Sequence, residues 1–163
     1  MTSDMELLEV ESVATKLSQA WQFLSGEQRN FELMEKQCFL HNLQEFSFYM
    51  PMEVKTEGRT GGLAVLIPRD DAIRVAAYMF DVNPEELQEP DLKDACAEVC
   101  NVFSDCIVMH VSGTEDVSVG LPCMVDNQFV SVSKNSVITA IYQSNIKLGN
   151  LVIVVYDVLY QPS

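Results

Sequence analysis

Four polar residues, Asp94, Glu98, Asn101 and Asp105, recur near the middle of the chain at spacings of three and four. Residues at these spacings share one face of an α-helix, because the helix advances about 100° per residue. An amide accepts hydrogen bonds through its oxygen and donates them through its nitrogen, so Asn101 can orient a water molecule without acting as a base. We name these four residues the polar stripe, and their spacing predicts a helix over 91–111 that carries it.

The opposite side of this helix is apolar, as expected for a helix that packs on a core. Its apolar residues are Ala95, Val99, Phe103, Cys106 and Ile107. A polar band on such a helix is usually a plain solvated face, and on the pattern alone that is the favoured interpretation. A solvated face usually mixes lysine with glutamate at i,i+4 spacing, however. The polar stripe carries no cation and includes an asparagine, which is an indifferent helix former.

The segment Asp94-Ala-Cys-Ala-Glu98-Val-Cys-Asn101 resembles the D/S-x-x-x-E-x-x-N signature of the CheC/CheX/FliY phosphatases of bacterial chemotaxis. The resemblance includes the predicted strand and helix that precede the signature, over 62–79, and Pro122 after it. The chain carries one copy of the signature and has a CheX-like length, whereas residues 1–45 diverge from the family. The family usually has a glycine four residues after the signature asparagine, where this chain has Asp105.

The resemblance implies a phosphatase that hydrolyses the aspartyl phosphate of a CheY-type response regulator. Asn101 would orient the attacking water, and Glu98 would pair with the lysine beside the regulator's phosphorylation site, while Asp94 and Asp105 would contact the partner. Mg²⁺ would sit in the regulator's acidic pocket, so this chain would bind no cofactor or metal of its own. The resemblance also implies a homodimer. The alternative is a non-catalytic CheX-like binding module for a regulator or another signalling protein, which Asp105 favours.

The composition fits one cytoplasmic domain that spans residues 1–163. Acidic residues number 24 against 10 basic ones, and the net charge of −14 argues against nucleic acid or an anionic membrane as a partner. No apolar run reaches the ~18 residues that a membrane helix needs. The N-terminus is acidic where a signal peptide would be basic.

Cysteine and histidine suggest a metal site, but their positions argue against one. The five cysteines include no CxxC pair, and Cys96 with Cys100 lies roughly 9–15 Å along the helix axis from Cys106 with His110. These four residues cannot form one tetrahedral site, and burial in the core is the favoured interpretation. His41 has no serine or cysteine at a recognisable spacing, so a nucleophilic triad has no support.

The remaining pattern predicts an α+β fold with a largely antiparallel sheet packed against long helices. An amphipathic helix is expected to end at Gly26, and 27–44 favours helix only weakly. Period-two alternation over 46–54 and an apolar run over 63–67 predict a β-hairpin, followed by a helix through Phe80. Strands are expected over 115–121, 128–133, 136–144 and 151–160. The last of these is the most apolar and could pair at a sheet edge.

Overall fold

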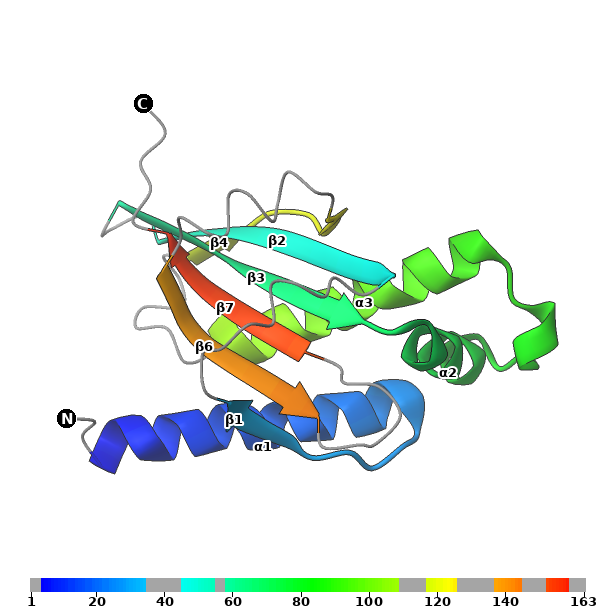
Figure 1. Cartoon of the computed structure of the whole chain (residues 1–163), viewed down its shortest axis with the longest axis horizontal. Helices are drawn as coiled ribbons and strands as arrows, with labels where there is room; N and C mark the ends of the chain where they lie inside the picture. Colours follow the sequence, from blue (N-terminus) through cyan, green and yellow to red (C-terminus); the bar gives the residue numbers. More distant parts are fainter. Residues whose placement is uncertain are drawn as a thin grey trace.

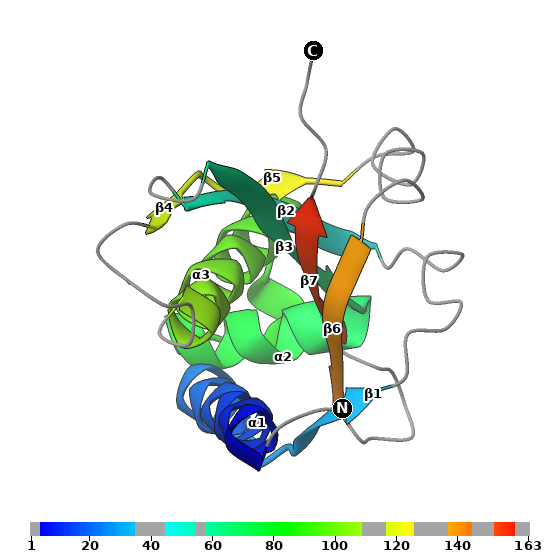
Figure 2. The ribbon, with the colours of Figure 1, turned by 90° about the vertical axis from the view of Figure 1, so that its left-hand side faces the viewer.

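The computed structural model describes residues 4–34, 45–54, 58–108, 117–125, 137–144 and 152–158. In this part of the chain, three α-helices pack against one face of a single antiparallel sheet (Figures 1 and 2). The helices are α1 (Asp4–Ser25), α2 (Arg69–Phe80) and α3 (Glu89–Val108), with a short 3₁₀ helix, η3 (Pro84–Glu86), before α3. The strands are β1 (Phe31–Met34), β2 (Phe46–Val54), β3 (Arg59–Ile67), β4 (Val117–Val119), β5 (Cys123–Met124), β6 (Val137–Ser144) and β7 (Val152–Val158).

The strand order reveals a repeat of topology. The sheet runs β1-β6-β7-β3-β2-β4, and β5 pairs with β2 beyond the end of β4. One half of the chain is α1 followed by β1, β2 and β3, and the other is α3 followed by β4, β6 and β7. If β1, β2 and β3 are exchanged with β4, β6 and β7, the strand order is the same read from the opposite edge of the sheet. The helix α2 has no counterpart among the described residues of the second half.

The predicted hairpin is confirmed, with β2 and β3 antiparallel from Phe46↔Ile67 to Val54↔Arg59. The alternation in β2 places Phe48 and Met50 in the core beneath the helices, while Glu53 is exposed on the other face. The close approach of Tyr49 to β3 explains one glycine. A Cβ atom on Gly62 would lie 2.3 Å from the Tyr49 ring. The expected strand over 128–133 lies outside the described residues.

Two sequence-based expectations were wrong. The segment 27–44 favoured helix, but Phe31–Met34 forms the edge strand β1. Only Phe31 of β1 is buried, and the other three residues of this short strand are exposed. The Phe31 ring meets the Phe103 ring edge-on at 5.7 Å, and the Phe31 N–H donates to Ser18 Oγ. The apolar strand over 151–160 could have paired at a sheet edge, but β7 lies between β3 and β6. At this place the backbone of β7 pairs with a strand on each side, so β7 offers no free edge.

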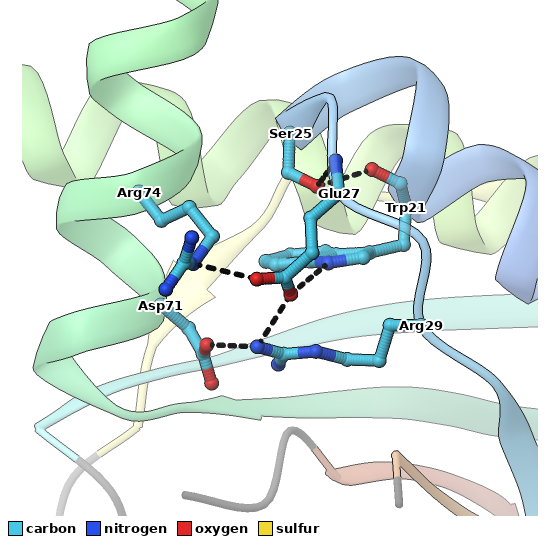
Figure 3. Close-up of polar contacts among 6 residues, drawn as sticks. All are labelled: Trp21, Ser25, Glu27, Arg29, Asp71 and Arg74. Carbon is cyan, nitrogen blue, oxygen red and sulfur yellow. Dashed lines mark hydrogen bonds and ion pairs between the residues drawn. The ribbon is translucent and has the colours of Figure 1, made fainter. Parts of the chain in front are cut away.

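A buried ion cluster ties the connection after α1 to α2 (Figure 3). Arg29 and Asp71 are 4% and 5% exposed, and Arg29 Nη2 lies 2.8 Å from Asp71 Oδ1 and 2.7 Å from Glu27 Oε1. Glu27 also accepts a hydrogen bond from Trp21 Nε1 and pairs with Arg74 at 3.0 Å. The Arg29 guanidinium stacks over the Trp21 ring at 4.9 Å. The cluster thus fixes α1, β1 and α2 relative to one another.

The cysteines of α3 lie in the core beneath this cluster. Burial, with a smaller contribution from the Asp71 carboxylate, raises the pKa of the Cys96 thiol to about 12. Burial also raises the pKa of Cys100, helped by the neighbouring thiols of Cys96 and Cys123. Both thiols are therefore neutral near physiological pH, and the expectation that they belong to the core is confirmed for Cys96 and Cys100.

We predict that Asp71→Ala lowers the free energy of unfolding by about 3 kcal/mol, because it leaves Arg29 buried with one anionic partner fewer. Urea denaturation measures this change. Asp70→Ala is the matched control, since Asp70 is an exposed carboxylate in the same first turn of α2. It should cost about 0.5 kcal/mol or less. Equal losses for the two variants would contradict the role assigned to the Arg29–Asp71 pair.

We predict that Cys123 reacts with Ellman's reagent in the folded protein, while Cys96 and Cys100 react only as fast as the chain unfolds. Cys123 is exposed and the other two are buried. A Cys38→Ser background removes the cysteine outside the described residues. Folding raises the pKa of the Cys96 thiol from 9.0 to about 12. Ionisation of Cys96 therefore favours the unfolded chain, so the free energy of unfolding is unaffected by Cys96 below about pH 9 and falls as the pH rises toward 12. Rapid native-state labelling of Cys96 would refute the burial argument.

Candidate functional site

The helix α3 places the whole polar stripe on the surface. Asp94, Glu98, Asn101 and Asp105 are all exposed. They fall within an arc of about 60° and extend about 16 Å along the helix axis. The opposite side of α3 is buried against β2, β3, α1 and α2, through Leu92, Ala95, Cys96, Val99, Cys100, Phe103, Ser104 and Ile107. The burial of this side fixes the direction in which the stripe points.

The side chains of the polar stripe are free to meet a partner. Within the described ranges, no ion pair or side-chain hydrogen bond engages the carboxylates of Asp94, Glu98 or Asp105. The Asn101 side-chain amide likewise has no hydrogen-bond partner among these residues. The Asn101 backbone carbonyl accepts a hydrogen bond from Ser104 Oγ at 2.7 Å. A helical face of three carboxylates with no neutralising cation carries a negative potential that favours a basic partner.

The Asp105 end of the polar stripe lies beside α1. Cys106 Sγ donates to the backbone carbonyl of Lys16 at 3.8 Å. Burial and then the Asp105 carboxylate raise the pKa of the Cys106 thiol, while Lys16 lowers it. Lys16 therefore lies close enough to Cys106 to act on it electrostatically.

A bulge on the free edge of β2 was not predicted from the sequence. Residues 117–125 run along the free edge of β2, and the Cys123 thiol acts electrostatically on Cys100 of α3. Between Val119↔Met52 and Tyr49↔Cys123 this edge carries one residue more than β2, so the chain bulges and Leu121 is 86% exposed. The sequence signal for this bulge is weak, since Gly120 and Pro122 mark only a turn.

No metal site or membrane helix is found in the part of the chain that the structure describes. There, no three residues of the types His, Cys, Asp and Glu gather closely enough to hold a metal ion. No described helix has both the length and the apolar character needed to cross a membrane. His41, His110 and Cys38 lie outside the described residues. The catalytic and partner-binding roles of the polar stripe stay predictions at this point.

Comparison with known proteins identifies the fold. No protein-family model matches the chain, and no curated protein has a matching sequence. A CheC-like superfamily protein from Shewanella sp. PV-4 matches with a TM-score of 0.65 and 12% identity, over 96% of this chain and 98% of that one. A chain of the CheX-CheY-BeF3-Mg²⁺ complex from Borrelia burgdorferi matches with a TM-score of 0.65 and 15% identity, over 92% and 97%.

The same architecture also occurs in a chain of a second kind of complex. A chain of the FliG-FliM complex from H. pylori matches with a TM-score of 0.57 and 16% identity, over 97% of this chain and 95% of that one. At such identities the likeness is one of fold. It covers nearly the whole of each chain, and the α+β architecture expected from the sequence is confirmed. The chain has the fold of the CheC-like and CheX chemotaxis proteins.

Proposed function

We propose that this chain is a phosphatase that hydrolyses the aspartyl phosphate of a CheY-type response regulator. The observation that carries the proposal is the exposed pair of Glu98 and Asn101 on α3, unengaged by other side chains among the described residues. The CheX-like fold supports it, as does the solution of one such relative as a complex with CheY, BeF3 and Mg²⁺. The signature over 94–101 gives the two side chains their roles.

Hydrolysis of an acyl phosphate depends mainly on positioning, because the phosphoryl group is already activated. The water oxygen bonds to phosphorus as the bond to the regulator's aspartate breaks, and inorganic phosphate and a free carboxylate result. The Asn101 amide would hold this water in line by accepting one hydrogen bond and donating another. Mg²⁺ held by the regulator would neutralise the phosphoryl oxygens, so the proposal requires no metal ligand from this chain.

Glu98 would anchor the regulator through its conserved active-site lysine. Glu98 and Asn101 are one turn apart, about 4.5 Å along the axis and about 60° around it, so both can reach one reaction centre. The flanking carboxylates of Asp94 and Asp105 would steer a basic surface toward them. Such long-range attraction raises the rate of association more than the final affinity.

A binding module without hydrolysis is the second candidate, and one observation favours it. Asp105 adds an exposed carboxylate one turn beyond Asn101, where the resemblance leads us to expect glycine. A charge at this position can hold a partner farther from the water-orienting amide. The FliG-FliM match supports the general point that this fold serves proteins that assemble with others.

The proposal also includes a cytoplasmic location, where response regulators act, and a homodimer. The structure removes the sequence argument that β7 pairs across an edge, since β7 is internal. Within the described part of the sheet, the free edges are β1 on one side and β4 with β5 on the other. A dimer that extends the sheet would use one of these edges.

We predict that Asn101→Ala slows phosphate release from a phosphorylated receiver by at least about 100-fold, while receiver binding changes little, because the water guide is lost and little contact area goes with it. Glu98→Ala should weaken binding by about tenfold and slow release as well. Loss of the phosphorylated receiver, followed with Mg²⁺ and a small-molecule phosphodonor, measures turnover, and titration with a BeF3-activated receiver measures binding.

Asp105→Asn is the matched control, since it removes a charge from the same face without altering the water guide. It should change KM and its dependence on salt, and leave kcat unchanged. Full activity of Asn101→Ala would overturn the assignment. Binding of the wild-type chain to receivers without any hydrolysis would instead establish the binding module.

We predict that sedimentation equilibrium gives twice the chain mass of 18.3 kDa. A mass of one chain across the accessible concentration range would exclude the homodimer and leave the phosphatase proposal standing, because both members of the Glu98–Asn101 pair come from one helix.

A further inference from the structure

A groove runs along the outer face of α2, away from the polar stripe. Its cavity volume is about 560 Å³, and it is lined by α2 side chains and by Pro84 of η3. Figure 1 shows α2 at one end of the molecule, beyond the ends of the strands. The described residues that line it come from α2, its C-cap Asp81 and Pro84, while another side of α2 packs on α1 and α3. We name this feature the α2 groove.

The α2 groove has an apolar floor and a fixed aromatic wall. Ile73 and Ala77 line it and are partly buried. Tyr78 forms the wall and is 57% exposed. The other side of its ring packs on the backbone of Gly26, where a Cβ atom would lie only 2.5 Å from the ring. A large aromatic side chain held in place in this way offers contact area at a low cost in conformational entropy.

The charges that border the α2 groove are acidic. Asp70 and Asp81 lie at its two ends, about 16 Å apart along α2, and both are exposed. Arg74 lies between them, and its Nε atom pairs with Glu27 at 3.0 Å, on the side of α2 that faces the ion cluster. Exposed glutamates of η3 add to the negative charge beyond Pro84. The acidic residues at this border outnumber the one arginine, so the border favours a ligand that brings positive charge.

We propose that the α2 groove is a second protein-docking surface, which receives a basic amphipathic segment of another protein. Apolar residues of that segment would cover Ile73 and Tyr78, and a lysine or arginine near each end would meet Asp70 and Asp81. The same acidic rim disfavours nucleic acid and anionic lipid. It also disfavours a second copy, because this chain has 24 acidic residues against 10 basic ones.

The first test uses a fluorescent helical peptide of alanine and leucine with one lysine near each end, spaced to match Asp70 and Asp81, and a control peptide with glutamates instead. The full-length protein should bind the lysine peptide, more weakly as salt rises, and reject the glutamate peptide. Backbone NMR shifts should map to α2 and η3. Absence of binding at millimolar peptide, equal binding of both peptides, or shifts centred on α3 would each overturn the proposal.

Matched variants localise the binding. Tyr78→Ser should weaken the lysine peptide about tenfold or more, because it removes the aromatic wall. Phe80→Ser, which also removes an exposed aromatic residue of α2 but one outside the groove, should leave affinity unchanged. The double variant Asp70→Asn, Asp81→Asn should weaken binding of the lysine peptide about tenfold.

Tyr78→Ser should leave the dephosphorylation of a receiver unchanged, because the α2 groove contains no residue of the polar stripe. If the peptide does not bind the α2 groove, the function proposed for the polar stripe is therefore not affected. Equal effects of Tyr78→Ser and Phe80→Ser would refute the groove as the site.

Discussion

The one-sided burial of α3 is the constraint on which the candidate site depends. Its inner face packs on β2, β3 and the other two helices, and residues such as Val99 and Phe103 are completely buried. A rotation of the helix that exposed these side chains would cost several kcal/mol of apolar burial. Glu98 and Asn101 must therefore face outward, and their separation is set by the helical repeat. The sheet supplies the rigid support, and the helix supplies the spacing.

The ion cluster around Arg29 shows how the support itself is held. A buried guanidinium is costly, and here two carboxylates and an indole face it. Among the described residues, Arg29 Nε, Arg29 Nη1 and Asp71 Oδ2 have no hydrogen-bond partner, so the cluster is incompletely satisfied there. Such a cluster adds specificity of arrangement more than stability, because it is satisfied best when α1, β1 and α2 adopt one relative position.

Much of this architecture follows from local patterns in the sequence. The alternation in β2 and the three- and four-residue spacing along α3 each report which face is buried, so the hairpin and the exposed polar stripe could be predicted. The strand β1 could not, because it buries only Phe31 and owes its conformation to pairing with β6 and to contact with Phe103. The central place of β7 was missed for a similar reason, since an apolar strand reveals burial but not its neighbours. The bulge at Leu121 and the α2 groove depend on contacts between distant segments, which no local pattern reports.

The interleaving of the two halves in the sheet has a consequence for how the chain is made. In the described part, β1 pairs only with β6, whose residues come more than a hundred positions later, and β3 pairs with β7, whose residues come roughly ninety positions later. Contacts between such distant segments are slow to form, since a long loop must close first. On the ribosome the first helix and strand emerge well before their partners exist. The edges of β1 and β3 stay open until β6 and β7 have been made, although α1 can already pack on β1, α2 and α3. Before β6 and β7 emerge, these open strand edges are the surface that a chaperone can hold.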